Sequence, residues 1–472
     1  MSEAVRASGK RLIVFEVGGV ISGDLTISNG DVTVAGHTAP YPGITIIRGT
    51  VDISANNVVI SHIAVRVGDA TGEADGIVIY STNVVLDHVI STWGVDETLT
   101  LKGSDNVTLY KCVIAEALSH SVHEEGEHSK GNLIFRICDP VSIIGCLYAH
   151  NRMRNPRISD SRVVMVNSIV YDPATGKDDD NGGHNYFVHL GDNGEQPNIP
   201  EVSFVGNVGL HGPDTDVKAQ YLLNGHKDEK GKAYMKDNII QDRDGKNLTI
   251  ADGGIIPLDE PPLWPDGLET IPAHESIYEV LRTVGPQPGR RESVTKRVVT
   301  TVADGTGGII NSQNEVGGYP NYNATKRALT VPNGAEARRA WLDSIENSIA
   351  VDKEIDLSRL YSRIGSKDSD KLSDRVNASS GRKRKNPAIK INQAYSNRQH
   401  LITSLTLPAP SSVGMTLFDL SGKNVAALRA QKLLPAGTHD LKVDIHHLPA
   451  GSYMFRFKIG STVQSLFYIH DI

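Results

Sequence analysis

The chain has 472 residues, 39% of them hydrophobic, and a formal net charge of −7 at pH 7. The acidic balance argues against a general nucleic-acid-binding protein, and no apolar run approaches the roughly 18 residues of a membrane-spanning helix. With 45 glycines, 22 prolines and 6% aromatic residues, the composition is typical of a turn-rich β protein whose core rests on Val, Ile and Leu.

The chain opens on one short helical pattern and then enters a strand at residues 13–17 (Ile-Val-Phe-Glu-Val). Its first residues lack the apolar segment of a signal peptide. Because so little sequence precedes the first strand, we expect either that the opening is truncated or that a leader is missing. Residues 13–66 predict strands and turns without visible chemistry.

A short phrase, Val-x-apolar-x-x-small-apolar, repeats through the first half of the chain. It begins at Val58, Val84, Val107, Val141, Val163 and Val202. Alternating apolar positions rich in β-branched residues predict strands. One such unit per roughly 20–40 residues predicts a solenoid, in which each coil buries its apolar face on the next. A doubly wound sheet would need amphipathic helices between the strands, so we expect an all-β, right-handed parallel β-helix.

Acidic residues gather on neighbouring units of this repeat. Asp87 is the one carboxylate among the six residues that follow the second apolar position, Asp75 precedes it, and Asp96 and Glu97 follow. Like positions of adjacent coils lie ~4.7–4.9 Å apart, so these acids can share one face. Such a cluster repels itself without a cation, and oxygen ligands suit Ca²⁺. The alternative is a set of unrelated surface acids on loops.

Basic residues follow the acidic ones. They are His120, His123, Arg152, Arg154, Arg157 and Arg162. Guanidinium groups bind carboxylates bidentately, so acids on one coil and arginines on the next suit a substrate that carries many carboxylates. The alternative is that the arginines neutralise the acids in structural ion pairs.

The second half of the chain changes character twice. Residues 274–284 and 335–349 fit short amphipathic helices. Residues 352–399 are polar and charged, which is typical of a linker. Residues 400–472 contain short alternating strands that predict a small antiparallel β-sandwich. We therefore expect a β-helix domain over 1–351, then the linker and the C-terminal domain. Three cysteines at this density indicate buried, reduced thiols.

Residues 83–88 (Asn-Val-Val-Leu-Asp-His), followed by Ser-x-Trp-x-x-Asp-Glu at 91–97, resemble the calcium-site segment of polysaccharide lyase family 1, the pectate lyases. The resemblance continues through 112–116, 121–123 and 150–157, the last with Arg-x-Pro-Arg, and covers about residues 5–322. It implies Ca²⁺-dependent β-elimination on α-1,4-polygalacturonate (pectin).

The resemblance implies roles for individual acids. Asp87 corresponds to a primary Ca²⁺ ligand and Asp96 to a second one. The acid expected four residues after Asp96 is Thr100 here, and Glu97 is expected to substitute for it. Asp75 corresponds to a position that helps to hold an additional, substrate-bridging Ca²⁺.

It also implies roles for the basic residues. Arg154 corresponds to the catalytic base and Arg157 to a contact with a substrate carboxylate. The lysine that the family places before the catalytic arginine has no clear counterpart, so His120, His123 and Arg152 are expected to bind substrate instead. A guanidinium with a pKa above ~12 is a poor base at neutral pH, so an alkaline optimum is expected.

Residues 400–472 resemble, more loosely, the sorting domain of the type IX secretion system, through their two Leu-Pro-Ala-Gly turns and final strand. This resemblance implies an exported protein, secreted or at the cell surface, that contacts secretion machinery. Independently of it, we expect a monomer that binds neither nucleic acid nor membrane.

Two other functions stay open. A galacturonan hydrolase on the same fold needs paired acids, and Asp96 and Glu97, the one adjacent pair in the acidic segment, should point to opposite faces if both lie on a strand. A non-catalytic solenoid that binds carbohydrate is the third hypothesis.

Overall fold

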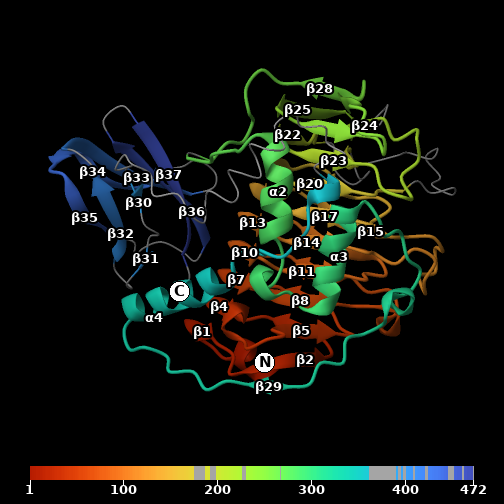
Figure 1. The fold of residues 1–472 in the computed structure, drawn as a ribbon, viewed down its shortest axis with the longest axis horizontal. Coiled ribbons are helices and arrows are strands. Elements are labelled where there is room, and N and C mark those ends of the chain that lie inside the picture. Colours follow the sequence, from red (N-terminus) through yellow and green to blue (C-terminus); the bar gives the residue numbers. More distant parts are fainter. Residues whose placement is uncertain are drawn as a thin grey trace.

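The computed structural model describes residues 1–174, 187–191, 198–225, 230–265 and 267–360, and in the C-terminal part 390–391, 395–396, 400–407, 410–419, 424–444, 451–459 and 462–470. Three parallel sheets wind together into a β-helix (Figure 1), which confirms the predicted fold class. Each full coil passes once through the first, the second and the third sheet.

The first sheet runs in the order β1 (Arg11–Ile13), β4 (Val32–Ala35), β7 (Val58–Ser61), β10 (Val84–Asp87), β13 (Val107–Tyr110), β16 (Val141–Ile144), β19 (Arg162–Val166), β22 (Glu201–Val205), β25 (Gly231–Lys236) and β28 (Ile255–Pro257). The second contains β2 (Val17–Ser22), β5 (Ile44–Ile47), β8 (Ile63–Arg66), β11 (Ile90–Thr92), β14 (Val113–Ala115), β17 (Leu147–Ala149), β20 (Ile169–Tyr171), β23 (Val208–Leu210) and β26 (Ile239–Gln241), with β29 (Thr325–Lys326) antiparallel on β2. The third contains β3 (Leu25–Ile27), β6 (Val51–Ile53), β9 (Ile77–Ile79), β12 (Glu97–Lys102), β15 (Lys130–Phe135), β18 (Arg157–Ile158), β21 (Val188–Leu190), β24 (Tyr221–Gly225) and β27 (Thr249–Ala251).

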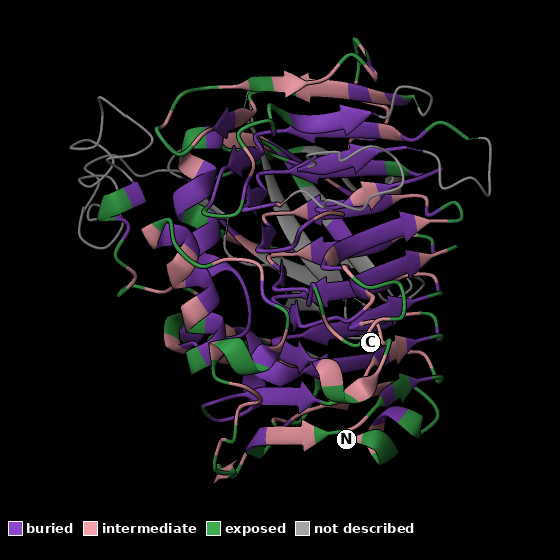
Figure 2. Ribbon diagram, turned by 90° about the vertical axis from the view of Figure 1, so that its right-hand side faces the viewer, coloured by how far each residue is buried: buried purple, intermediate pink, exposed green. Residues whose placement is uncertain are grey.

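The repeated phrase sets the register of the first sheet. The residues that follow its second apolar position stack on one another in the predicted order, namely Ser61, Asp87, Tyr110, Ile144, Val166 and Val205. The inward-facing Val, Ile and Leu of all three sheets form one long core, which appears as the stack of buried strands in Figure 2. The cysteines Cys112, Cys138 and Cys146 are buried and free, as predicted.

Single residues in the left-handed backbone conformation make the turns between sheets. Asn57, Asn83 and Asn106 (φ 60°, 61° and 52°) precede β7, β10 and β13. Each of these side-chain amides donates to the residue one coil before, at 2.8–2.9 Å, so the turns form a ladder. His62 and His88 (φ 55° and 52°) make the corner between the first and second sheets. Asparagine and histidine are both enriched in this conformation.

Helices cover the second sheet. Both predicted helices are confirmed, as α2 (Ala273–Thr283) and α4 (Ala335–Ile349). A helix that periodicity did not indicate, α3 (Ser293–Asp304), runs beside α2 and packs with it on the outer face of β8, β11, β14 and β17 (Figure 1). A short helix, α1 (Ser2–Arg6), begins the chain, and short 3₁₀ turns lie at η1 (Gly36–Thr38), η2 (Asp69–Thr71), η3 (Pro288–Arg290) and η4 (Gln313–Val316).

The C-terminal part forms two antiparallel sheets. One contains β30 (Lys390–Ile391), β31 (Tyr395–Ser396), β32 (His400–Leu407) and β35 (Gly437–Asp444), and the other β33 (Ser411–Asp419), β34 (Asn424–Leu434), β36 (Gly451–Ile459) and β37 (Thr462–His470). The predicted antiparallel strands are therefore present. Most of the predicted linker, 361–389, lies outside the described residues, and the domain limits stay predictions. Among the described helices, none is long and apolar enough to cross a membrane.

Candidate functional site

Three carboxylates converge at the corner between the second and third sheets. Asp96 follows β11 and Glu97 begins β12, while Asp75 precedes β9 on the adjacent coil. One oxygen from each side chain lies within 4.8 Å of the other two. Asp75 Oδ1 also accepts a hydrogen bond of 3.0 Å from the Glu97 backbone N–H, which fixes the two coils in this arrangement.

The charges of this acidic corner are only partly balanced. Burial, and secondarily the neighbouring Asp96, raises the pKa of Asp75 to about 6. Burial also acts to raise the pKa of Asp96, but the hydrogen bond from His128 and the charge of Lys130 outweigh it, so the pKa of Asp96 is lowered. The corner thus pairs a firmly ionised carboxylate with one that resists ionisation, as expected for acids crowded without a cation.

Two cations lie on the next coils of the same sheet. Lys130 begins β15 directly opposite Glu97, and its Nζ is 3.8 Å from Asp96 Oδ1. Arg154 precedes β18 and forms an ion pair with Glu97. Asp75, Glu97, Lys130 and Arg154 therefore mark four successive coils, and acids face bases along one edge of the third sheet.

Two histidines lie beside Asp96. The rings of His123 and His128 stack at 3.5 Å between centroids. His128 Nε2 is 2.9 Å, and His123 Nε2 3.7 Å, from Asp96 Oδ1. Lys130 Nζ is 2.5 Å from His128 Nε2. Sequence reasoning named His123 but missed His128 and Lys130. The signal for Lys130 was its place at the start of a strand one coil beyond Glu97.

The other basic residues differ in their environments. The His120 side chain is exposed, and its backbone N–H donates to Asn311 Oδ1 at 3.0 Å. Arg152 is 3% exposed and pairs with Glu127 at 2.9 Å, as a structural ion pair would. Arg157 lies half-buried in β18, next to the inward-facing Ile158.

Arg157 lies on the outer face of the third sheet, in register with Leu133 and His189 on the adjacent strands. Thr100, where an acid was expected, is in register with Leu133 on the next coil. Its hydroxyl approaches Asp75 and partly offsets the effect of burial on the pKa of that carboxyl.

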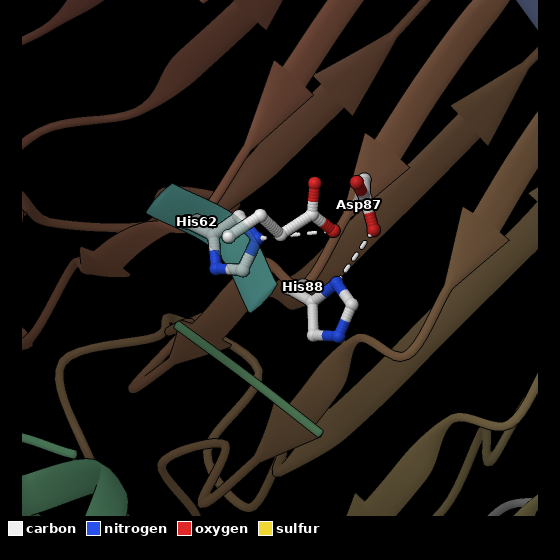
Figure 3. Close-up of side chains that lie close together, drawn as sticks. His62, Asp87 and His88 are labelled. Atoms are coloured by element: carbon white, nitrogen blue, oxygen red, sulfur yellow. Dashed lines mark hydrogen bonds and ion pairs between the residues drawn. The ribbon is translucent and has the colours of Figure 1, made fainter. Parts of the chain in front are cut away.

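Asp87 does not join this site, which corrects the expectation that it shares one ion with Asp96. It ends β10, at the corner between the first and second sheets, and strand β11 separates it from Asp96. Its neighbours are His62, His88 and Glu346, as Figure 3 shows for the two histidines. Adjacency in sequence misled because the chain turns a corner within that interval.

Asp96 and Glu97 also differ from the expectation that they point to opposite faces. Asp96 precedes the strand that Glu97 begins, so the alternation of side chains along a strand does not apply to the pair. Both therefore reach the same corner.

The acidic corner suits a calcium ion. Asp75, Asp96 and Glu97 offer oxygen atoms alone, from two coils, and hard oxygen ligands are those that Ca²⁺ prefers. Burial, and to a smaller degree the charge of Asp96, raises the pKa of Asp75, and a divalent cation bound there would stabilise its ionised form. A cation there would compete with Arg154 for Glu97.

No family model matches the chain. A protein named "Probable pectate lyase C" from Aspergillus flavus is 29% identical over 337 residues, covering 67% of this chain and 73% of that protein. Its namesake from Emericella nidulans is 29% identical over 371 residues, covering 75% and 80%. These similarities indicate a pectate lyase-like protein.

Solved structures of pectate lyases are more remote. One, described for its substrate specificity and anti β-elimination mechanism, is 13% identical, with a TM-score of 0.37 over 57% of this chain and 69% of its own. The thermostable pectate lyase PL 47 is 12% identical, with a TM-score of 0.31 over 56% and 69%.

Proposed function

We propose that this chain is a Ca²⁺-dependent lyase that cleaves α-1,4-polygalacturonate by β-elimination. The observation that carries the proposal is the alignment of Asp75, Asp96 and Glu97 with Lys130 and Arg154 along one edge of the third sheet. Acids that hold a cation beside fixed guanidinium and ammonium groups suit a sugar acid, and the similarity to proteins named pectate lyase supports it.

In this mechanism Asp75, Asp96 and Glu97 would hold Ca²⁺. The ion, when bound, supplies Lewis-acid polarisation of the substrate's C6 carboxylate, which acidifies the C5 proton. Lys130 and Arg157 position substrate carboxylates by charge and by bidentate hydrogen bonding. Arg154 accepts the C5 proton, and the bond between C4 and the glycosidic oxygen breaks as the C4–C5 double bond forms.

The ion pair between Arg154 and Glu97 would couple the protonation of Arg154 to metal binding. A carboxylate partner holds a guanidinium in its protonated form. When Glu97 serves as a metal ligand, that stabilisation of the protonated guanidinium weakens. Lys130, together with a bound cation, would then disfavour the protonated form of Arg154. The base could therefore act at a lower pH than a free guanidinium, whose pKa lies above ~12, although the optimum should remain alkaline.

A polygalacturonate assay tests the proposal. With Ca²⁺, the unsaturated product should give rising ultraviolet absorbance, and a chelator should abolish it. Arg154→Ala should abolish it too, whereas Arg162→Ala should not, because Arg162 is exposed and pairs with Asp139 away from the site. Absorbance that is indifferent to both the chelator and Arg154→Ala would refute the proposal.

A galacturonan hydrolase is the second candidate. Asp75, with a pKa raised to about 6, lies beside the ionised Asp96, which resembles the acid and base of a glycosidase. Their nearest oxygens lie within 4.8 Å of each other, however, which is closer than the roughly 6.5–9.5 Å of an inverting pair. New reducing ends without ultraviolet absorbance would identify this activity.

Export and sorting through residues 400–472 belong to the same proposal. The two antiparallel sheets are compatible with an attachment domain. Deleting 400–472 and following the secreted fraction in the native host would test that role.

A further inference from the structure

A second cluster of potential metal ligands lies at the corner where Asp87 ends β10. His62 and His88 make the corner turns of adjacent coils, and Glu346 reaches them from α4 (Figure 3 shows the two histidines with Asp87). One ligand atom from each of the four side chains lies within 4.8 Å of all the others. His62 is 0% exposed, and Asp87 and His88 are each 5% exposed.

The chemistry of this set differs from that of the acidic corner. Two imidazoles and two carboxylates form a mixed nitrogen and oxygen set, which suits Zn²⁺ better than Ca²⁺. His88 Nδ1 lies 2.6 Å from Asp87 Oδ1, and His62 Nε2 lies 3.9 Å from Glu346 Oε1. The His62 and His88 rings are stacked nearly parallel, with their centroids 4.6 Å apart.

The charge of the cluster is that of a divalent cation with opposite sign. Metal binding takes histidines as neutral imidazoles and acids as ionised carboxylates. In a metal-bound cluster, Asp87 and Glu346 would therefore contribute two negative charges at a place where Asp87 is 5% exposed.

Two cations lie near the cluster, with Lys111 Nζ 3.4 Å from Glu279 and Arg339 Nε 2.9 Å from Asp343. His37 and Tyr110, whose rings pack edge-on against His62 and His88, complete its walls.

His88 is held as a metal ligand would be, whereas His62 would have to give up one contact to bind a metal. His62 Nε2 is buried and makes no hydrogen bond to any described residue. His88 also hydrogen-bonds the backbone of Thr283, and such a contact orients a metal-bound imidazole. His62 Nδ1 accepts a long hydrogen bond of 3.3 Å from the Gln287 N–H. Loading Nε2 would move the ring proton to Nδ1 and break that contact.

We propose that His62, Asp87, His88 and Glu346 form a closed Zn²⁺ site that fixes α4 to the first two sheets. Four protein ligands leave no open position, which is typical of a structural zinc site. Glu346 has 27% of its side chain exposed, so an ion would reach the site from the solvent beside Glu346. Because α4 also contacts η1, η3 and β31, the ion would stabilise the junction between the β-helix and the C-terminal sheets. The proposal is independent of the lyase activity.

Zinc titration of the full chain, freed of metal by a chelator, tests this site. Isothermal calorimetry and the melting temperature would be compared among the wild type, Glu346→Gln and Glu354→Gln. Glu354 is a matched control, because it is an exposed glutamate shortly after α4. Circular dichroism in the presence of chelator establishes that each variant folds, and His62→Gln replaces Glu346→Gln if the latter does not.

The wild type and Glu354→Gln should bind a zinc equivalent that raises the melting temperature and that excess Ca²⁺ does not displace. Glu346→Gln should lose that equivalent, with an affinity lower by about 100-fold or more, since even residues behind the ligands are worth about 10–100-fold. Identical zinc isotherms for the wild type and Glu346→Gln would overturn the proposal, as would the absence of zinc binding by the wild type.

Discussion

Two corners of one coil carry acids beside histidines, but their surroundings differ. The corner at Asp87 is closed, because α4 covers it and delivers Glu346 to it. The corner at Asp96 is half-buried and continues along the sheet edge into Lys130 and Arg154. The packing outside a coil therefore decides whether its carboxylates are closed off by a helix or remain accessible along the sheet edge.

Replacing Arg154 by Ala should have the largest effect on the open corner. Loss of a positioned general base typically costs about 10²–10⁴-fold, so kcat for the unsaturated product should fall by that range. Progress curves of ultraviolet absorbance measure it. A kcat within about threefold of the wild type would show that the open corner is not where the proton is removed.

The next largest effect should be the pH dependence of Ca²⁺ binding at the corner that contains Asp75. Asp75, with a pKa of about 6, must lose its proton to act as a ligand. The Ca²⁺ affinity should therefore fall by up to about tenfold per pH unit below about 6, measured by calorimetry. Asp75→Asn should bind weakly at every pH. An affinity that does not change between pH 5 and 7 would contradict the assignment of Asp75 as a ligand.

The same carboxyl links pH to folding without Ca²⁺. A free Asp ionises near 3.9, so the folded chain holds an extra proton between about pH 4 and 6, and its stability falls as the pH rises through that window. Asp75→Asn should lack this slope in urea unfolding. Parallel pH profiles for the wild type and Asp75→Asn would contradict the burial argument.

Arg152→Ala should affect stability more than catalysis, although the sequence analysis placed Arg152 with the substrate. Its ion pair with Glu127 is mostly buried, so its loss should cost roughly 1–3 kcal/mol in the free energy of unfolding. Urea unfolding and KM should be measured together. A large rise in KM with unchanged stability would return Arg152 to substrate binding.

The smallest effect is expected at the surface. Arg162 and Asp139 form an exposed pair at 2.9 Å, and such pairs are worth about 0–1 kcal/mol. Arg162→Ala should leave kcat, KM and the melting temperature nearly unchanged. A strong loss of activity would extend the site beyond Arg154 and Arg157.

Much of the fold could be predicted because a short sequence phrase repeats once in each coil. The phrase from Val58 to Val202 sets the register of the coils, and the structure follows it at each step. Helix α3 escaped notice, because its capping by Glu292 and its place beside α2 depend on partners that are distant in the chain.

The candidate sites were harder to predict than the fold. Spacing in the sequence brought Asp87 and Asp96 near each other, but one strand and two corners keep them apart. Glu346 lies close to Asp87 in space but far from it in the sequence, and no local sequence pattern indicates such a contact. Lys130 was missed for a milder reason, since the length of the loop between β14 and β15 hides its register with Glu97.

The most direct measurement is the Ca²⁺ affinity of Asp96→Asn beside that of Asp87→Asn, each followed by calorimetry and by the ultraviolet assay on polygalacturonate. The account predicts that Asp96→Asn loses both Ca²⁺ binding and product formation, while Asp87→Asn keeps its Ca²⁺ affinity. Loss of Ca²⁺ binding in a folded Asp87→Asn, with normal binding in Asp96→Asn, would contradict it.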